Sequence, residues 1–195
     1  MSSWVAAIVD TRGRSDFWDV ARSQRVSASA DTVPVRALIE CAGDFDASTR
    51  LAEALSAELE TSAVGLLMQT GADVHGVRAF DRGKLVRRID YSRDSGGWLV
   101  VSGAPQPWES VFFFDGPADL ARGTPWPDTI SDDLSDADIA RYETARAIGD
   151  ASNVMDLVHA SGGSIHRVAA ALGVDPSQPA GRYRRPRWWQ RALGR

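Results

Sequence analysis

Three histidines, His75, His159 and His166, are the side chains of this sequence best suited to acid-base or metal chemistry. Histidine changes charge near neutral pH and is a common zinc ligand. No two of the three are four residues apart, the spacing that places two ligands on one helix face, and the single cysteine, Cys41, cannot supply a cysteine pair. The sequence therefore predicts no metal site. We expect the histidines at ordinary surface or boundary positions and Cys41 as a packed thiol.

Carboxylates are concentrated in residues 131–138, where four aspartates lie close together. An EF-hand loop needs a central glycine and a bidentate glutamate at its twelfth position, and this stretch has neither. The aspartates are instead typical of a helix N-terminus, with Ser135 as the cap. The chain also lacks a glycine-rich phosphate loop and a Gly-x-Ser-x-Gly elbow. We therefore assign no catalytic residue and no cofactor, although carboxylates distant in sequence could still meet in space.

The last fifteen residues, 181–195, contain six arginines, two adjacent tryptophans and no acid, whereas residues 1–180 hold all 26 acidic residues. Such a tail suits nucleic acid, an anionic membrane surface, or the acidic body of the same chain or of a second copy. Because a tethered segment meets its own body at an effective concentration on the order of millimolar, we favour self-docking. The residues predicted to bind a partner or to dock the tail are Arg184, Arg185, Arg187, Trp188, Trp189 and Arg191.

Two other segments could contact nucleic acid or an acidic partner. Residues 163–177 resemble the first helix and turn of a helix-turn-helix, which would place residues 178–185 in the major groove. Pro179 and Gly181 would interrupt that second helix, so we favour a packed amphipathic helix over specific DNA binding. A predicted hairpin also carries several basic side chains. We interpret them as a solvated sheet face, with a recognition surface as the alternative: Arg78, Arg82, Lys84, Arg87, Arg88 and Arg93.

Hydrophobic periodicity and turn residues predict an α+β fold, in which an antiparallel β-meander is packed by helices and followed by a small C-terminal helical segment. Apolar runs predict strands at residues 4–9, 33–41, 63–69, 74–80, 85–91, 98–102 and, at an edge, 111–114. Caps and apolar stripes predict helices at residues 15–23, 46–60, 136–148, 150–160 and 164–173. The corresponding divisions are a sheet domain (1–115), a linker (116–135), a helical segment (136–180) and the basic tail (181–195).

The N-terminal residues predict a cytoplasmic protein, because they form neither a signal peptide nor a membrane span. Residues 63–114 are similar in general style to small uncharacterised bacterial α+β proteins, some of them toxin-immunity proteins, through Phe80–Lys84, Ser95–Trp98 and Pro105–Glu109. The resemblance implies a non-enzymatic protein that binds a single partner, and it supplies no functional residues.

Our leading hypothesis is a cytoplasmic protein-binding module, such as an immunity or antitoxin-like protein, whose acidic body binds a basic partner. One alternative is a nucleic-acid-binding regulator that uses residues 164–195. Another is an enzyme with carboxylate or histidine chemistry. A homodimer is compatible with every one of these hypotheses.

Overall fold

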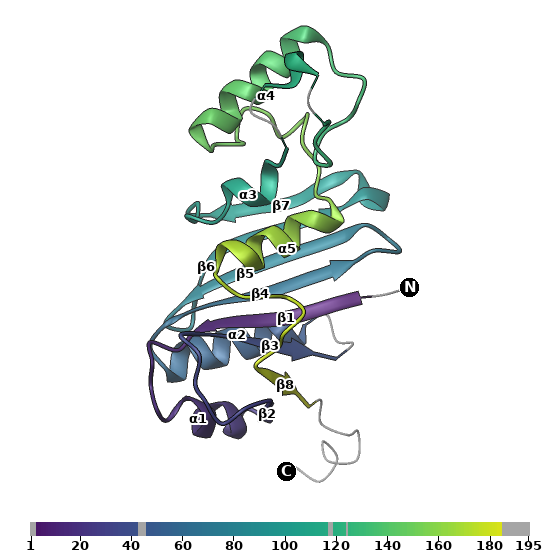
Figure 1. Ribbon diagram of the computed structural model, residues 1–195. Helices are drawn as coiled ribbons and strands as arrows, with labels where there is room; N and C mark the ends of the chain where they lie inside the picture. Colours follow the sequence, from purple (N-terminus) through teal and green to yellow (C-terminus); the bar gives the residue numbers. More distant parts are fainter. Residues whose placement is uncertain (1–2, 43–45, 117–118, 124, 185–195) are drawn as a thin grey trace.

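The protein is described by a computed structural model over residues 3–42, 46–116, 119–123 and 125–184. Its centre is a mixed, mostly antiparallel sheet of eight strands in the order β2-β8-β3-β1-β4-β5-β6-β7 (Figure 1). The strands are β1 (Ser3–Asp10), β2 (Val26–Ala28), β3 (Arg36–Cys41), β4 (Ser62–Gln69), β5 (Val74–Asp81), β6 (Lys84–Ser92), β7 (Gly97–Gly103) and β8 (Gly181–Tyr183). The α-helices of the described residues are α1 (Phe17–Ser23), α2 (Ala47–Glu58), α3 (Ser110–Phe113), α4 (Asp136–Ile148) and α5 (Gly162–Ala171). The α+β class predicted from the sequence is confirmed.

The hairpin of β5 and β6 shows how local sequence positions these elements. Its turn uses two residues with positive φ, Arg82 at 49° and Gly83 at 77°, as a tight hairpin turn requires. The Gly83 N–H donates to the Ser56 hydroxyl of α2 at 2.9 Å. A Cβ on Gly83 would lie 2.8 Å from the Ala57 Cβ, so a glycine lets the turn lie against the helix.

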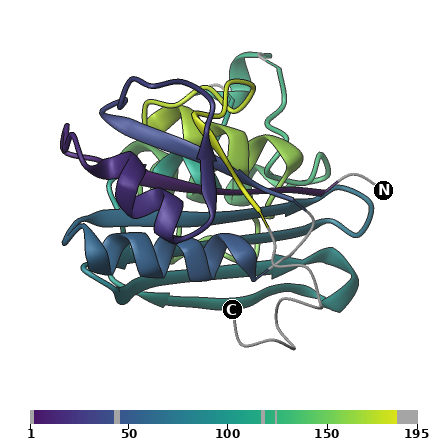
Figure 2. The ribbon, with the colours of Figure 1, turned by 90° about the horizontal axis from the view of Figure 1, so that it is seen from below.

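Helices lie over both faces of the sheet (Figure 2), and each face has its own hydrophobic core. On one face, α1 and α2 cover alternate residues of the strands, including Val9, Ile39 and Ala63. On the other face, α3 and α5 cover the intervening residues, including Ile8 and Val64. This alternation follows from the two-residue repeat of a strand, which directs successive side chains to opposite faces.

The second core continues beyond the sheet into residues 115–160, which we call the α4 lobe. Leu120, Ile130, Tyr142 and Val154 of this lobe are buried in the same cluster as the sheet residues Leu66 and Ile89. The predicted linker therefore contributes side chains to the core. The division of the chain into a sheet domain, a helical segment and a tail stays a prediction.

Three details of the predicted organisation were wrong. The sheet is mixed because β8 pairs in parallel with β3, and β8 consists of residues that we assigned to the basic tail. Residues 111–114 belong to helix α3 and its cap instead of an edge strand, because the Phe113 and Phe114 N–H groups donate to the Glu109 and Ser110 carbonyl oxygens at 3.4 and 2.8 Å, and this turn places Phe112 and Phe113 in the core. Residues 150–160 form turns and an isolated bridge, Ile130 to Val158, instead of a helix.

Candidate functional site

The α4 lobe has a strong excess of acidic over basic residues. It contains ten acidic and three basic residues, whereas the rest of the chain contains 16 acidic and 19 basic residues. In Figure 1 the lobe lies beyond β7, at the end of the molecule opposite β8. Six of those 19 basic residues belong to residues 181–195, so the rest of residues 1–180 holds 16 acidic and 13 basic residues. The negative charge of residues 1–180 is therefore concentrated in the lobe.

Helix α4 organises the acidic residues of the lobe. The Ser135 hydroxyl accepts the Asp138 N–H at 3.2 Å, which caps the first turn of the helix. A hydrogen bond from the same hydroxyl lowers the pKa of the Asp138 carboxyl. At the other end of the helix, Gly149 adopts a φ of 73° and ends it. Some of the carboxylates around α4 form no ion pair with a described residue: Asp132, Asp133, Asp136, Glu143 and Asp150.

A groove of about 350 Å³ runs along the surface of α4. One wall is a helix face of small side chains, Ala137, Ala140 and Thr144, and the end of that wall is Ile148. The side chain of Ile148 is 69% exposed, which is unusual for so large an apolar residue in a chain with two well-filled cores. The groove thus offers an apolar contact next to acidic side chains.

Arg141 holds the other wall of the groove in place. Its guanidinium donates to the Asn153 carbonyl oxygen at 2.9 Å and forms ion pairs with Asp156 at 3.0 Å and Asp138 at 3.1 Å. The hydrogen bond to Asp156 is the main cause that raises the pKa of Arg141, so the arginine stays charged. Because two carboxylates face this one cation, the rim of the groove remains negative.

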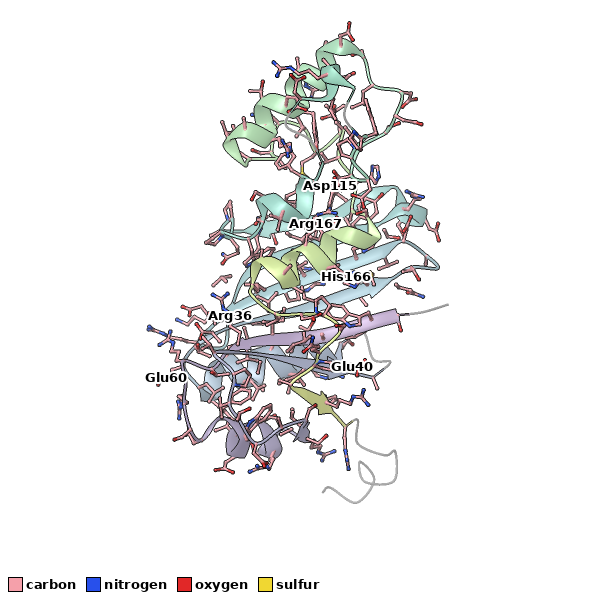
Figure 3. All side chains as sticks on the ribbon, viewed as in Figure 1. Arg36, Glu40, Glu60, Asp115, His166 and Arg167 are labelled. Atoms are coloured by element: carbon pink, nitrogen blue, oxygen red, sulfur yellow. The ribbon has the colours of Figure 1, made fainter. Side chains whose placement is uncertain are left out.

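A polar cluster attaches the lobe to the sheet domain and to α5 (Figure 3). Arg167 of α5 forms an ion pair with Asp115 at 3.1 Å and donates to the Val111 carbonyl oxygen at 2.9 Å. The other Asp115 oxygen accepts the Thr129 hydroxyl at 2.6 Å, and the Asp115 carbonyl oxygen accepts the Tyr142 hydroxyl at 3.0 Å. Burial is the main cause that lowers the pKa of Arg167 and raises that of Tyr142. These bonds fix the orientation of α4 relative to the sheet.

The predicted tail-docking residues are described only at Arg184. This residue is exposed, and its N–H donates to the Arg25 carbonyl oxygen at 3.0 Å, which continues the pairing beyond β8. Nearby, Arg182 forms an ion pair with Glu40 of β3 at 3.1 Å. The remaining predicted residues lie outside the described part of the chain: Arg185, Arg187, Trp188, Trp189 and Arg191.

The helix-turn-helix-like segment is packed into the fold. Ile165, Val168 and Ala169 of α5 are fully buried against the sheet. The residues that would form a recognition helix instead form a turn and strand β8, with Gly181 paired to Ile39. The sequence analysis favoured this packed arrangement, and the structure agrees with it.

Most cations of the predicted hairpin are paired within the sheet. Arg78 and Arg88 form ion pairs with Asp90 at 2.6 and 2.7 Å, and Arg93 does so with Asp73 at 3.0 Å. Arg87 is buried in an ion pair with Glu109, in which Nε donates to Oε2 at 2.9 Å. This pairing supports a structural role for the hairpin cations.

The histidines do not converge, and the surface or boundary position predicted for His75 was wrong, because this side chain is fully buried between neighbouring strands. His75 is in a row of side chains that crosses neighbouring strands on one face: Trp4, Met68, His75, Tyr91 and Trp98. His166 of α5 contacts the Trp4 ring edge at a centroid distance of 5.6 Å. Burial lowers the pKa of both His75 and His159. Among the described residues, no group of three or more histidine, cysteine, aspartate or glutamate side chains is arranged to hold a metal ion.

Comparison with known proteins finds no matching family model, no matching curated protein and no matching solved structure. Among the described residues, no helix has the length and apolar character needed to cross a membrane. The sequence analysis anticipated the acidic character of the body and Ser135 as the N-cap of α4. It missed the groove, for which the only available signal was Ile148 at the end of a helix face otherwise made of small residues.

Proposed function

We propose that this protein is a non-enzymatic protein-binding module that binds a basic partner through its α4 lobe, in the manner of immunity or antitoxin proteins. The observation that carries the proposal is the combination of an acidic surface with an apolar groove at one end of the molecule. Opposite charge accelerates encounter and orients the partner, whereas burial of apolar side chains supplies most of the affinity.

The lobe has the properties expected of a rigid recognition surface. The cluster of Arg167 and Asp115 fixes it to the sheet domain, and Arg141 fixes the two walls of the groove to each other. A surface that is ordered before binding loses little conformational entropy in the complex. The partner would place a basic, partly apolar segment along α4, with its apolar side chains against Ile148 and its cations toward the carboxylates.

The test is co-purification of the products of adjacent genes with the full-length protein at 50 and 300 mM salt. We expect a basic protein to co-purify at low salt and to dissociate as salt is raised, because salt screens exposed charges. The variant Asp132→Lys/Asp133→Lys/Asp136→Lys should lose it. A matched variant with the same change in net charge, Asp31→Lys/Glu53→Lys/Asp81→Lys, should retain it, since these exposed carboxylates lie outside the lobe.

A second variant, Ile148→Ser, tests the contribution of the groove to binding. Because this side chain is 69% exposed, its replacement should change stability little, while the affinity for the partner falls at least tenfold. Val35→Ser is the control, since Val35 is 73% exposed and lies far from the lobe in sequence. Failure of every adjacent gene product to bind, or retention of the partner by the triple-lysine lobe variant, would overturn the proposal.

A further inference from the structure

A second cavity, of about 330 Å³, lies on the sheet face that α5 covers. It is located where β1 ends and β3 and β4 begin, at the C-terminal end of α5. The floor is formed by Ile8, Val64 and Ala79, and Trp108 and Leu172 form part of the opposite wall. Its volume is at the lower end of the range of small-molecule sites, and it has their composition, which is a mostly apolar lining with a few polar groups.

Besides Ser62 and Gln106, the polar lining includes two opposite charges on neighbouring strands. Asp10 of β1 and Arg36 of β3 are register partners, which places their Cβ atoms roughly 5 Å apart. They nevertheless form no ion pair with each other. Asp10 accepts the Arg12 N–H at 3.0 Å, and Arg36 donates to the Leu172 carbonyl oxygen at 2.7 Å, at the end of α5 (Figure 3). No basic side chain of the described residues lies within ion-pair distance of the Asp10 carboxylate.

Trp108, which lines this cavity, has a hydrogen-bond donor without a partner among the described residues. Trp108 is only 7% exposed, yet its indole N–H donates to no described residue. The indole nitrogen is not among the fully buried polar atoms. By contrast, the indole N–H groups of Trp18, Trp98 and Trp126 each donate to a backbone carbonyl oxygen, at 3.1, 2.9 and 2.9 Å. A buried indole normally finds an acceptor, so the Trp108 N–H is a position at which a ligand could accept a hydrogen bond.

The wall that carries Trp108 is held rigidly. The buried Glu109 carboxylate accepts the Gln106 N–H at 3.1 Å as well as the Arg87 guanidinium, and Arg87 also donates to the Gly103 carbonyl oxygen at 2.7 Å. These bonds tie both ends of the segment 103–109 to β6. The cavity is therefore shaped before any ligand enters, which reduces the entropy lost on binding.

The pair of charges selects the ligand. Arg36 would repel a simple cation, and Asp10 would repel a simple anion, whereas a molecule with both charges close together satisfies both. We propose that this cavity binds a zwitterionic α-amino acid with an apolar side chain. Its ammonium group would lie at Asp10, its carboxylate at Arg36 and the Trp108 N–H, and its side chain over Ile8, Val64 and Ala79. This site is independent of the α4 lobe and of the protein-binding function proposed above.

The test on the unmodified protein is titration calorimetry with L-leucine and L-phenylalanine. Each is compared with the analogues that keep one charge: isoamylamine and 4-methylpentanoate for leucine, phenethylamine and 3-phenylpropanoate for phenylalanine. We expect at least one amino acid to bind, and to bind at least tenfold more tightly than its two singly charged analogues. Absence of binding of both amino acids at 10 mM, or equal binding of an analogue, would overturn the proposal without any variant being needed.

Variants then assign the contacts. Asp10→Asn and Arg36→Gln should each weaken binding of the amino acid at least tenfold, since hydrogen bonds to charged groups are the stronger ones. Asp10→Asn should also reduce the preference for the amino acid over the carboxylate analogue. Trp108→Phe keeps the aromatic packing and removes the donor, and should weaken binding about fivefold. Asp31→Asn, at an exposed position outside the cavity, is the control. Unchanged affinity in both the Asp10 and the Arg36 variants would place the ligand elsewhere and reject the site.

Discussion

At the scale of single residues, His75 makes stability depend on pH. Its side chain is fully buried, neither ring nitrogen has a hydrogen-bond partner, and the nearest carboxylate oxygen, on Asp73, is 3.8 Å from Nε2. Burial lowers its pKa from the ordinary value of 6.5. Below pH 6.5 the unfolded chain therefore binds a proton that the folded protein does not, so stability is full above this pH and decreases as the pH falls through it.

We predict that His75→Leu weakens this pH dependence. Between pH 7.5 and 5.5 the wild type should lose up to about 1 kcal/mol of unfolding free energy through this group, and the variant should not show that part of the loss. Urea unfolding at the two pH values measures it. Burial also lowers the pKa of His159, so the contribution of His159 to the pH dependence remains in the variant. His166→Gln, at an exposed position, is the control, and an identical pH dependence in wild type and His75→Leu would contradict the prediction.

Arg87 and Glu109 form the most buried ion pair among the described residues, with side chains 7% and 9% exposed. Removing one partner leaves the other charge without compensation in the core. We predict that Arg87→Met lowers the unfolding free energy by about 3–5 kcal/mol, and that adding Glu109→Gln recovers part of this loss. Arg88→Met, which affects an exposed pair on the same strand, should cost only about 0–1 kcal/mol. Additive losses in the double variant, measured by denaturant unfolding, would show that the two side chains are not coupled.

At the scale of elements, the sequence predicts best the segments whose structure depends on nearby residues. The leucine stripe of residues 46–60 predicts α2, which spans Ala47–Glu58. The turn at Gly83 predicts the hairpin, and the buried apolar run that begins at Ala63 predicts β4. In each of these segments the local sequence favours the same structure that the tertiary contacts require. No local preference therefore had to be overridden when the chain folded.

The elements that we predicted incorrectly depend on contacts between residues distant in sequence. Residues 110–113 form a helical turn because Glu109 is held by Arg87, which lies 22 positions earlier in the chain. Strand β8 has only three residues and no alternation of its own, and it exists because β2 and β3 pair with it on both sides. For the same reason the cavity at Trp108 could not be predicted, since it combines residues from several elements. The groove at α4 was missed because it forms between α4 and residues 150–154, which we predicted as part of a helix.

Ser135 provides a test of how far one cap stabilises the α4 lobe. Its hydroxyl accepts the Asp138 N–H and donates to the Asp138 carboxylate at 2.7 Å. We predict that Ser135→Ala lowers the unfolding free energy by about 1 kcal/mol and speeds hydrogen exchange of the first amides of α4. Ser131→Ala, at an exposed position in the same acidic stretch but outside the helix, should leave both measurements nearly unchanged. Faster exchange throughout the sheet in the Ser135 variant would contradict a local role.

At the scale of the whole molecule, strand β8 and the acidic lobe lie at opposite ends of the described structure, because the lobe lies beyond β7 (Figure 1). In the sequence, the basic residues 185–195 follow β8. Six strand intervals separate these strands, about 29 Å at the usual spacing. Eleven residues reach roughly 36–40 Å only when fully extended. Docking of residues 185–195 on the lobe of the same chain would therefore use almost their full length, which leaves the lobe open to another partner.

The place of β8 also changes how the tail is tested. Deleting residues 181–195 would remove β8 and its pairing with β2 and β3, so a loss of stability would not report on the tail. A chain that ends at Arg184 keeps the whole sheet.

If residues 185–195 dock on their own body through Trp188 and Trp189, we expect this deletion to lower the unfolding free energy by about 2 kcal/mol, because burial of large apolar side chains is lost. Trp188→Ala/Trp189→Ala should reproduce most of that loss, and Arg185→Gln/Arg187→Gln little of it, since exposed ion pairs contribute about 0–1 kcal/mol each. Unchanged stability together with lost binding to single-stranded DNA at low salt would assign the tail to nucleic acid instead.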